Sequence, residues 1–255
     1  MELTINKDED NERPLNLEEF KLFRRATGQL LWLTCQTRPD LAYNSLVMSY
    51  NNQSAKVKDV KIANKFIKKA KAEESMVKFT RIGNFDDLII LNYSDASYLT
   101  IEDKTRSVAG RIVFLANKSE VKVSPICWKG KTIPQVCKSA KAAETRAVDM
   151  ATDEGLFMAR AVCEVYTGRK GRHQIPMTVK CDNLPVYDSL NSTKQVEEKM
   201  MRPVIQHLKD MIARSEISHF DRIDTNDCHA DVLTKANAKR CAEKVLQIFR
   251  TGQNI

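Results

Sequence analysis

Four short segments of the sequence each place one acidic side chain at the edge of an apolar stretch or inside it. The four residues are Asp95, Glu144, Asp182 and Asp231. An isolated buried carboxylate is costly unless a positive charge compensates it, so we expect the four to gather around a cation. Carboxylate oxygens are the hard ligands that Mg²⁺ prefers in proteins. The pattern therefore predicts a magnesium site built from residues far apart in the chain.

Each of these acids also has an ordinary structural interpretation. Asp95 could end a strand, and Asp182 could belong to a turn with Asn183. Glu144 could pair with a basic neighbour, and Asp231 could occupy the first turn of a helix, where the helix dipole stabilises an anion. A metal site is favoured only if the fold brings all four acids together, so the fold predicted from the sequence decides between the two interpretations.

The secondary structure expected from hydrophobic periodicity alternates between helices and strands. Helices are predicted over residues 20–33, 41–48, 57–71, 139–165, 201–212 and 238–249, and strands over 76–79, 88–94, 106–115, 121–128, 177–182 and 217–223. From residue 88 onward the order is three strands, a helix, a strand, a helix, a strand and a helix. This order predicts an α/β fold with a mixed sheet and helices on its faces. Asp95 and Asp182 then follow strands, and Glu144 faces the sheet.

Composition and charge limit the classes of function. The 255 residues are 42% hydrophobic, enough for one large or two small domains, and the net charge is +8. Residues 1–19 contain seven acidic and two basic residues, so the rest of the chain carries a surplus of thirteen positive charges. Such a surplus suits a phosphate polymer as partner. We expect the residues before about Leu15 to form an unstructured leader, because they are polar and lack periodicity.

Cysteine usage and hydropathy argue against a secreted or membrane protein. The seven cysteines are an odd number and show neither a Cys-x-x-Cys pair nor a Cys/His zinc spacing, so we expect reduced thiols. The most apolar stretches are too short or too charged to cross a bilayer, and the acidic start is unlike a signal peptide. A membrane partner is therefore not expected.

Six ordered motifs carry a resemblance to a known family. They are Tyr93–Ser97 (YSDAS), Ile126–Lys129 (ICWK), Lys138–Ser139 leading to Ala142–Thr145 (AAET), Cys181–Asn183 (CDN), Asn191–Lys194 (NSTK) and Ala230–Lys235 (ADVLTK). The segment that contains them resembles the ribonuclease H domain of copia-type LTR-retrotransposon Pol polyproteins. Upstream, residues 28–33 and 37–41 resemble the end of the reverse transcriptase in the same polyproteins.

The resemblance implies a fold and a domain division. The fold would be α/β, a ribonuclease H-like mixed five-stranded sheet flanked by helices and preceded by a small helical region like a polymerase thumb or connection. Residues 1–80 would form the acidic leader and that helical region, 86–236 the ribonuclease H-like domain, and 237–255 a C-terminal helix that packs on it or extends it.

The resemblance also implies an activity. The protein would be a Mg²⁺-dependent endonuclease that hydrolyses the RNA strand of RNA/DNA hybrids, with Asp95, Glu144, Asp182 and Asp231 as catalytic residues and metal ligands. The site would hold two Mg²⁺ ions, with Asp95 as the bridge between them. Mn²⁺ would be able to replace Mg²⁺. Its partners would be the hybrid and the upstream reverse transcriptase region, in the cytoplasm, in virus-like particles or in the nucleus.

Further residues are candidates for nucleic-acid binding, in each case beside the alternative of a solvated surface. They are Ser97, Lys129, Lys131, Lys138, Lys141 and Asn183, together with Lys65 and Lys68 from the lysine-rich face of the helix at 57–71. Trp128 could bind the hybrid or belong to the core. His229 is interpreted as a surface residue at a helix start, with assistance to product departure as the alternative.

Two departures from the family pattern leave other functions open. In residues 202–205 (RPVI), Val204 stands where an acidic residue is frequent in the family, and Pro203 is expected to interrupt its helix. Residues 137–141 (CKSAK) replace a stretch that is richer in hydroxyl groups in the family. The second hypothesis is accordingly a catalytically inactive or domesticated ribonuclease H-like module that binds nucleic acid or serves as a scaffold. The third is another nucleic-acid-processing member of the same superfamily, such as an integrase or a DNA nuclease.

Overall fold

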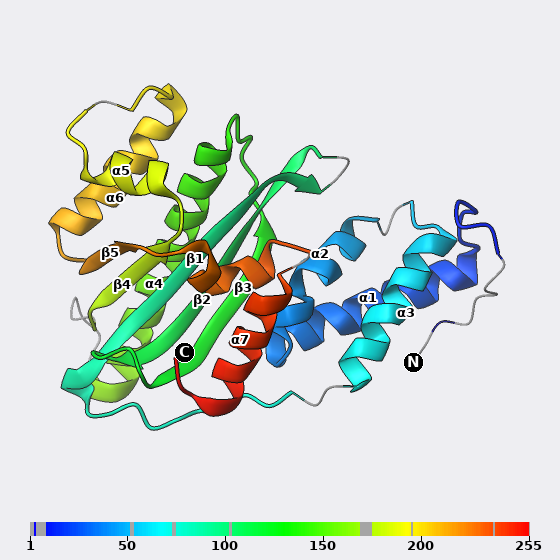
Figure 1. Cartoon of the computed structure of the whole chain (residues 1–255), viewed down its shortest axis with the longest axis horizontal. Helices are drawn as coiled ribbons and strands as arrows, with labels where there is room; N and C mark the ends of the chain where they lie inside the picture. Colours follow the sequence, from blue (N-terminus) through cyan, green and yellow to red (C-terminus); the bar gives the residue numbers. More distant parts are fainter. Residues whose placement is uncertain are drawn as a thin grey trace.

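A five-stranded mixed sheet forms the centre of the molecule in the computed structural model (Figure 1). Its strand order is β3-β2-β1-β4-β5. The strands are β1 (Leu88–Ile101), β2 (Arg106–Asn117), β3 (Val123–Thr132), β4 (Met177–Cys181) and β5 (His219–Arg222). The first three are antiparallel, whereas β4 is parallel to β1 and β5 to β4. The predicted α/β architecture, a mixed five-stranded sheet flanked by helices, is confirmed. The structure describes residue 3 and residues 9–51, 54–72, 75–101, 104–168, 175–194, 196–236 and 238–254.

Both faces of the sheet are covered. One face packs against α4 (Ala140–Thr167), α5 (Leu184–Asn191) and α6 (Arg202–Ala213). The other face packs against α7 (Lys239–Thr251) and the short 3-10 helix η6 (His229–Leu233). A strand buried on both faces has a continuous apolar sequence, which explains the unbroken run at the start of β1.

Helix α4 lies close to the sheet because small residues face it. Ala143, Ala147 and Ala151 are fully buried or nearly so. At Gly155 an added Cβ would lie 2.5 Å from Nδ2 of Asn92 and 2.6 Å from Sδ of Met177, so only glycine permits this approach. The helix is thus fixed against β1 and β4, the strands that carry Asp95 and lead to Asp182.

The N-terminal helices form a region with its own apolar core. They are α1 (Leu17–Gln36), α2 (Ala42–Tyr50) and α3 (Val57–Ala72), with the 3-10 helix η1 (Pro39–Leu41) between the first two. Their shared core contains residues such as Phe23. As predicted, the Arg-Pro-Asp sequence separates two helices.

This helical region docks against the sheet at β3, its edge strand (Figure 1). The indole Nε1 of Trp128 donates a hydrogen bond to the Thr34 carbonyl at 2.6 Å. The hydroxyls of Tyr50 and Thr132 form a second, short hydrogen bond. Trp128 also packs against Phe249 of α7, so it belongs to the core between these elements.

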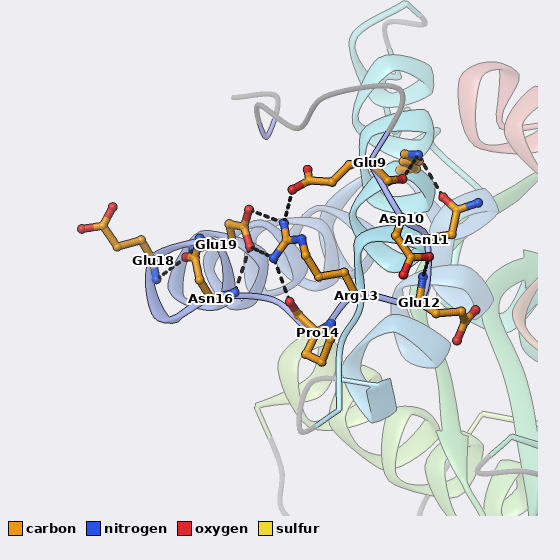
Figure 2. A network of polar contacts seen from close by, with 10 residues as sticks. Glu9, Asp10, Asn11, Glu12, Arg13, Pro14, Asn16, Glu18 and Glu19 are labelled. Atoms are coloured by element: carbon orange, nitrogen blue, oxygen red, sulfur yellow. Dashed lines mark hydrogen bonds and ion pairs between the residues drawn. The ribbon is translucent and has the colours of Figure 1, made fainter.

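The described part of the N-terminal segment is ordered, contrary to the expectation of an unstructured leader. Arg13 forms ion pairs with Glu9 at 2.7 Å and with Glu19 at 2.8 Å, and Asn16 caps α1 (Figure 2). Glu12 pairs with two lysines at the start of α3. The acidic residues therefore neutralise basic side chains of the helical region. Residues 1, 2 and 4–8 of the expected leader lie outside the described residues.

Several expected elements differ from those observed. Residues 76–79 form no strand, and α5 lies in a stretch for which no helix was expected. Pro203 stands in the first turn of α6 and so begins this helix instead of interrupting it. All seven cysteines are free thiols, as expected. Among the helices that the structure describes, none is both long enough and apolar enough to span a membrane.

Candidate active site

Asp95 is the buried centre of the acidic cluster. It lies within β1, which continues to Ile101, so the expectation that Asp95 closes the strand is wrong. Its side chain is 1% exposed and accepts a short hydrogen bond from the Thr234 hydroxyl. A carboxylate held in this way has a fixed orientation.

The side chain of Glu144 reaches the acidic cluster from α4. It lies on the side of the helix that was predicted to face the sheet. Ser139 caps the start of this helix by accepting a hydrogen bond from the Ala142 amide at 3.0 Å, which sets where the first turns lie. The buried Oε2 of Glu144 has no hydrogen-bond partner within the described part of the chain. A buried carboxylate oxygen without a partner is unusual and needs an explanation.

The four acids converge into two groups that share Asp95. Carboxylate oxygens of Asp95, Glu144 and Asp182 all lie within 4.8 Å of one another. Ligand atoms of Asp95, Asp231 and Cys228 satisfy the same limit. Asp182 directly follows β4, and Asp231 lies in η6, so four separate elements supply the carboxylates.

Burial and mutual repulsion favour the protonated, uncharged forms of Asp95, Glu144 and Asp231 over their ionised forms. Burial, followed by the charge of Asp231, raises the pKa of Asp95 to about 7. Burial, followed by the charges of Asp95 and Asp182, raises the pKa of Glu144 to about 9. The pKa of Asp231 is raised mainly by burial. The cluster therefore holds more negative charge than its protein surroundings compensate.

Lys235 contacts the acidic cluster, a position that sequence reasoning did not assign to it. Its Nζ lies 2.8 Å from Oδ1 of Asp231 and 3.4 Å from Oδ1 of Asp95. Burial lowers the pKa of this ammonium group, but the two carboxylates outweigh burial and raise the pKa above its ordinary value. The i, i+4 spacing from Asp231 to Lys235 was the available signal.

The donor set fits divalent cations that prefer oxygen ligands. The group of Asp95, Glu144 and Asp182 offers only carboxylates, and the unpartnered Oε2 belongs to it. A cation there would remove the repulsion that raises the pKa of Glu144. The second group differs, because Lys235 already places a positive charge between Asp95 and Asp231.

Two glycines allow η6 to lie directly on the sheet. At Gly110 of β2 an added Cβ would lie 2.7 Å from Cγ2 of Thr234 and 2.9 Å from the Ala230 carbonyl oxygen. At Gly130 of β3 it would lie 2.8 Å from the Leu233 carbonyl oxygen. These contacts fix the segment that carries Asp231 and its neighbours.

The predicted nucleic-acid-binding residues lie on several different elements. Lys129 and Lys131 are exposed on β3, and Lys138 is exposed before α4. Lys141 lines a hollow of about 520 Å³ between α4 and the segment that follows α5. Lys65 and Lys68 are both exposed on α3, but only Lys65 faces the hollow that also contains Lys235.

Two of the polar candidates have structural roles that the sequence did not assign to them. Asn183 caps α5 by accepting a hydrogen bond from the Val186 amide at 3.1 Å. The Ser97 hydroxyl donates a hydrogen bond to Oγ1 of Thr100 at 2.9 Å. Both residues follow an acidic residue of the cluster closely in sequence, and binding of nucleic acid by them stays a prediction.

The expectation that His229 is a surface residue is wrong. Its ring is 3% exposed and lies against Tyr93, with ring centroids 4.5 Å apart. Its Nε2 forms a hydrogen bond with Oδ1 of Asn254 at 3.2 Å, and burial lowers its pKa to about 4. The ring is packed inside this core, and the alternative role in product departure stays a prediction.

Comparisons with known proteins show similarity to several solved structures. The N-terminal RNase H domain of rv2228c from Mycobacterium tuberculosis is 13% identical, with a TM-score of 0.39 over 62% of this chain and 99% of that chain. LC11-RNase H1 in complex with RNA/DNA hybrid is 11% identical, with a TM-score of 0.41 over 57% and 92%. The foamy viral protease-reverse transcriptase in complex with RNA/DNA hybrid is 10% identical, with a TM-score of 0.38 over 73% of this chain and 26% of that chain.

Neither of the two sequence comparisons finds a relative. No protein-family model matches the sequence. A search of curated proteins also returns no match.

Proposed function

We propose that the protein is a ribonuclease H, an endonuclease that hydrolyses the RNA strand of RNA/DNA hybrids with the help of Mg²⁺, and that it derives from a copia-type retrotransposon Pol polyprotein. The observation that carries the proposal is the convergence of Asp95, Glu144 and Asp182 within 4.8 Å, with Asp231 in a second group that also contains Asp95. The copia-type motifs of the sequence contain all four acids. The surplus of positive charge outside residues 1–19 suits a nucleic-acid substrate.

The acids have distinct roles in this proposal. Asp95, Glu144 and Asp182 would hold one cation, and Asp95 and Asp231 would hold a second, because the ligand atoms within each group lie within 4.8 Å of one another. When bound, these ions supply the positive charge that lowers the pKa of a water molecule and neutralises the leaving oxygen. Asp95 belongs to both groups, and the Thr234 hydroxyl keeps its carboxylate oriented. The unpartnered Oε2 of Glu144 remains available to orient the attacking water or a ligand.

A cleavage assay tests this function. The full chain is incubated with a labelled RNA/DNA hybrid and Mg²⁺, beside Asp95→Asn, Glu144→Gln and Asp182→Asn. We expect the parent to cut the RNA strand and each variant to lose activity, while all four proteins bind the hybrid. Chelation with EDTA should abolish cleavage, and Mn²⁺ should restore it. Absence of cleavage by the folded parent with either ion would contradict the proposal.

One observation favours a second candidate, a module that binds nucleic acid without cutting it. The ammonium group of Lys235 lies between Asp95 and Asp231, where the second cation would be held. An internal cation at this place would reduce the need for a metal ion. Tight binding of the hybrid by the parent with no cleavage would support this candidate, and cleavage of double-stranded DNA would instead support a different nuclease of the same superfamily.

A further inference from the structure

Two adjoining hollows lead away from the acidic cluster toward the helical region. The first has a volume of about 290 Å³ and is lined by Asp231, Lys235 and Arg240 among others. The second has a volume of about 520 Å³ and lies between α3, α7 and the segment after η6. The two hollows are neighbours, because Lys235 and Lys239 line both. We refer to the second hollow, lined by Lys65, Lys69, Lys235 and Lys239, as the α3–α7 cleft.

Positive charge predominates along this path. Three elements far apart in sequence contribute the lysines, namely α3, the end of the η6 segment and α7. Asp40 also lines the cleft, but its carboxylate is neutralised by Arg38 at 2.8 Å and by Lys69 at 2.9 Å. The other acidic residue at the cleft is Glu243, which is exposed.

Two of the lysines are available to a ligand. Lys65 and Lys239 are exposed, and within the described part of the chain neither ammonium group forms an ion pair. An ammonium group on a flexible stem binds phosphate oxygens as a point charge, without selecting a base. A row of such groups that begins beside the candidate catalytic acids fits a polymer of phosphates better than a single small anion.

We infer that the α3–α7 cleft binds the backbone phosphates of one strand of the RNA/DNA hybrid beyond the point where the hybrid meets the acidic cluster. This inference rests on the proposed function and adds to it a binding path for the backbone of the substrate. The helical region thereby contributes directly to substrate binding, through Lys65, while Lys239 contributes from α7. Lys235 lies where the path meets the catalytic acids.

Binding measured without cleavage tests the inference. Dissociation constants of the full chain for hybrids of increasing length are measured by fluorescence anisotropy in EDTA, over a range of salt concentrations. The variants are Lys65→Gln, Lys239→Gln and the double variant, and the control is Lys21→Gln, an exposed lysine of α1 that lines neither hollow. Lys69 is left unchanged because it pairs with the buried Asp40.

The expected result depends on hybrid length. For long hybrids each single variant should weaken binding several-fold and reduce the slope of log K against log salt by about 1, since one phosphate contact is lost. For hybrids too short to leave the acidic cluster, the variants should bind as tightly as the parent. The control should bind every hybrid like the parent, and circular dichroism should show that all variants are folded.

Other outcomes would overturn the inference. If Lys65→Gln and Lys239→Gln bind long hybrids like the parent, the cleft is not on the path. If Lys68→Gln, on the same helix but outside the cleft, weakens binding as much as Lys65→Gln, the effect reflects the general charge of α3 and not this path. Failure of the parent to cleave, with the length-dependent binding intact, would refute the proposed activity and leave the binding path standing.

Discussion

The ammonium group of Lys235 lies 2.8 Å from the Asp231 carboxylate, one helical turn away in sequence, and also 3.4 Å from Asp95. Among the described residues, Glu144 and Asp182 also lie near Asp95, but neither forms an ion pair with Lys235. Lys235 is thus paired directly with two of the four acids, although its charge also acts to lower the pKa of Glu144. The two pairs of acids should respond differently to metal ions and to substitution.

Replacement of Lys235 should strengthen metal binding. In Lys235→Met no ammonium group competes for Asp95 and Asp231, so the dissociation constant for Mg²⁺ or Mn²⁺ at the second position should fall on the order of tenfold. Isothermal titration calorimetry on the substrate-free protein measures this directly. Lys21→Met serves as the control, and an unchanged metal affinity in Lys235→Met would show that Lys235 does not compete.

Neutralisation of Glu144 should stabilise the metal-free protein while it removes activity. Glu144→Gln keeps the shape of the side chain and replaces a carboxyl group that the folded protein keeps mostly protonated at pH 8, because its pKa is about 9, whereas the unfolded chain ionises it. The free energy of unfolding in EDTA at pH 8 should rise on the order of 1–3 kcal/mol. Urea denaturation measures it, and a loss of stability would mean that the charge of Glu144 is compensated within the protein.

The stability of the metal-free protein should fall as the pH rises. The pKa values of Asp95, about 7, and of Glu144, about 9, lie above those in the unfolded chain, which are about 4. Between these limits the folded protein retains protons that the unfolded chain has released, so higher pH favours unfolding. The contribution of these two acids is thus fully present below about pH 4 and is lost progressively up to about pH 9.

Comparison with a variant isolates this contribution from that of all other titrating groups. The difference in unfolding free energy between the parent and an Asp95→Asn, Glu144→Gln double variant should change with pH in this window in EDTA. Saturating Mg²⁺ should reduce the pH dependence of the parent, because bound cations stabilise the ionised carboxylates. A difference that is independent of pH in EDTA would show that the two acids titrate normally.

The close contact between η6 and the sheet should be sensitive to one methyl group. In Gly110→Ala the new Cβ would clash with Thr234 and with the Ala230 carbonyl, so η6 must shift away from β2. We expect a loss of about 1–3 kcal/mol in stability and reduced hybrid cleavage. Gly28→Ala is the matched control, since no atom lies within 4 Å of its Cβ and alanine is the better helix former in α1. Equal stability of the two variants would argue against tight packing of η6.

Much of the fold was predictable because hydrophobic periodicity determined the order of the elements. The strands that become β1 to β5 and the helix that becomes α4 were all expected at their positions, since both faces of the sheet require apolar residues. The second half of β1 was not expected, because half-buried and exposed residues alternate from Ser97 to Thr100. Helix α5 was missed, although a proline in the first turn and an asparagine cap are both favoured at a helix start.

The convergence of the four acids followed from the motifs and the element order, but their surroundings did not. The contacts of Lys235 with Asp95 and Asp231 depend on the side-chain geometry of one turn, which sequence spacing permits but does not require. His229 is polar, and its burial arises from Tyr93 and from the distant Asn254, which no local pattern reveals. The docking of α1 and α2 on β3 likewise depends on contacts between residues such as Thr34 and Trp128.

That docking has a consequence for any attempt to isolate the sheet-containing part alone. β3 is an edge strand, and unpaired backbone groups at such an edge can recruit a strand from another molecule. Tyr50 and Thr34 hold the helices over this edge by their hydrogen bonds to β3 side chains. A fragment that begins at Leu88 would uncover Trp128 and the outer margin of the sheet, and it would be prone to self-association in a way that the intact chain is not.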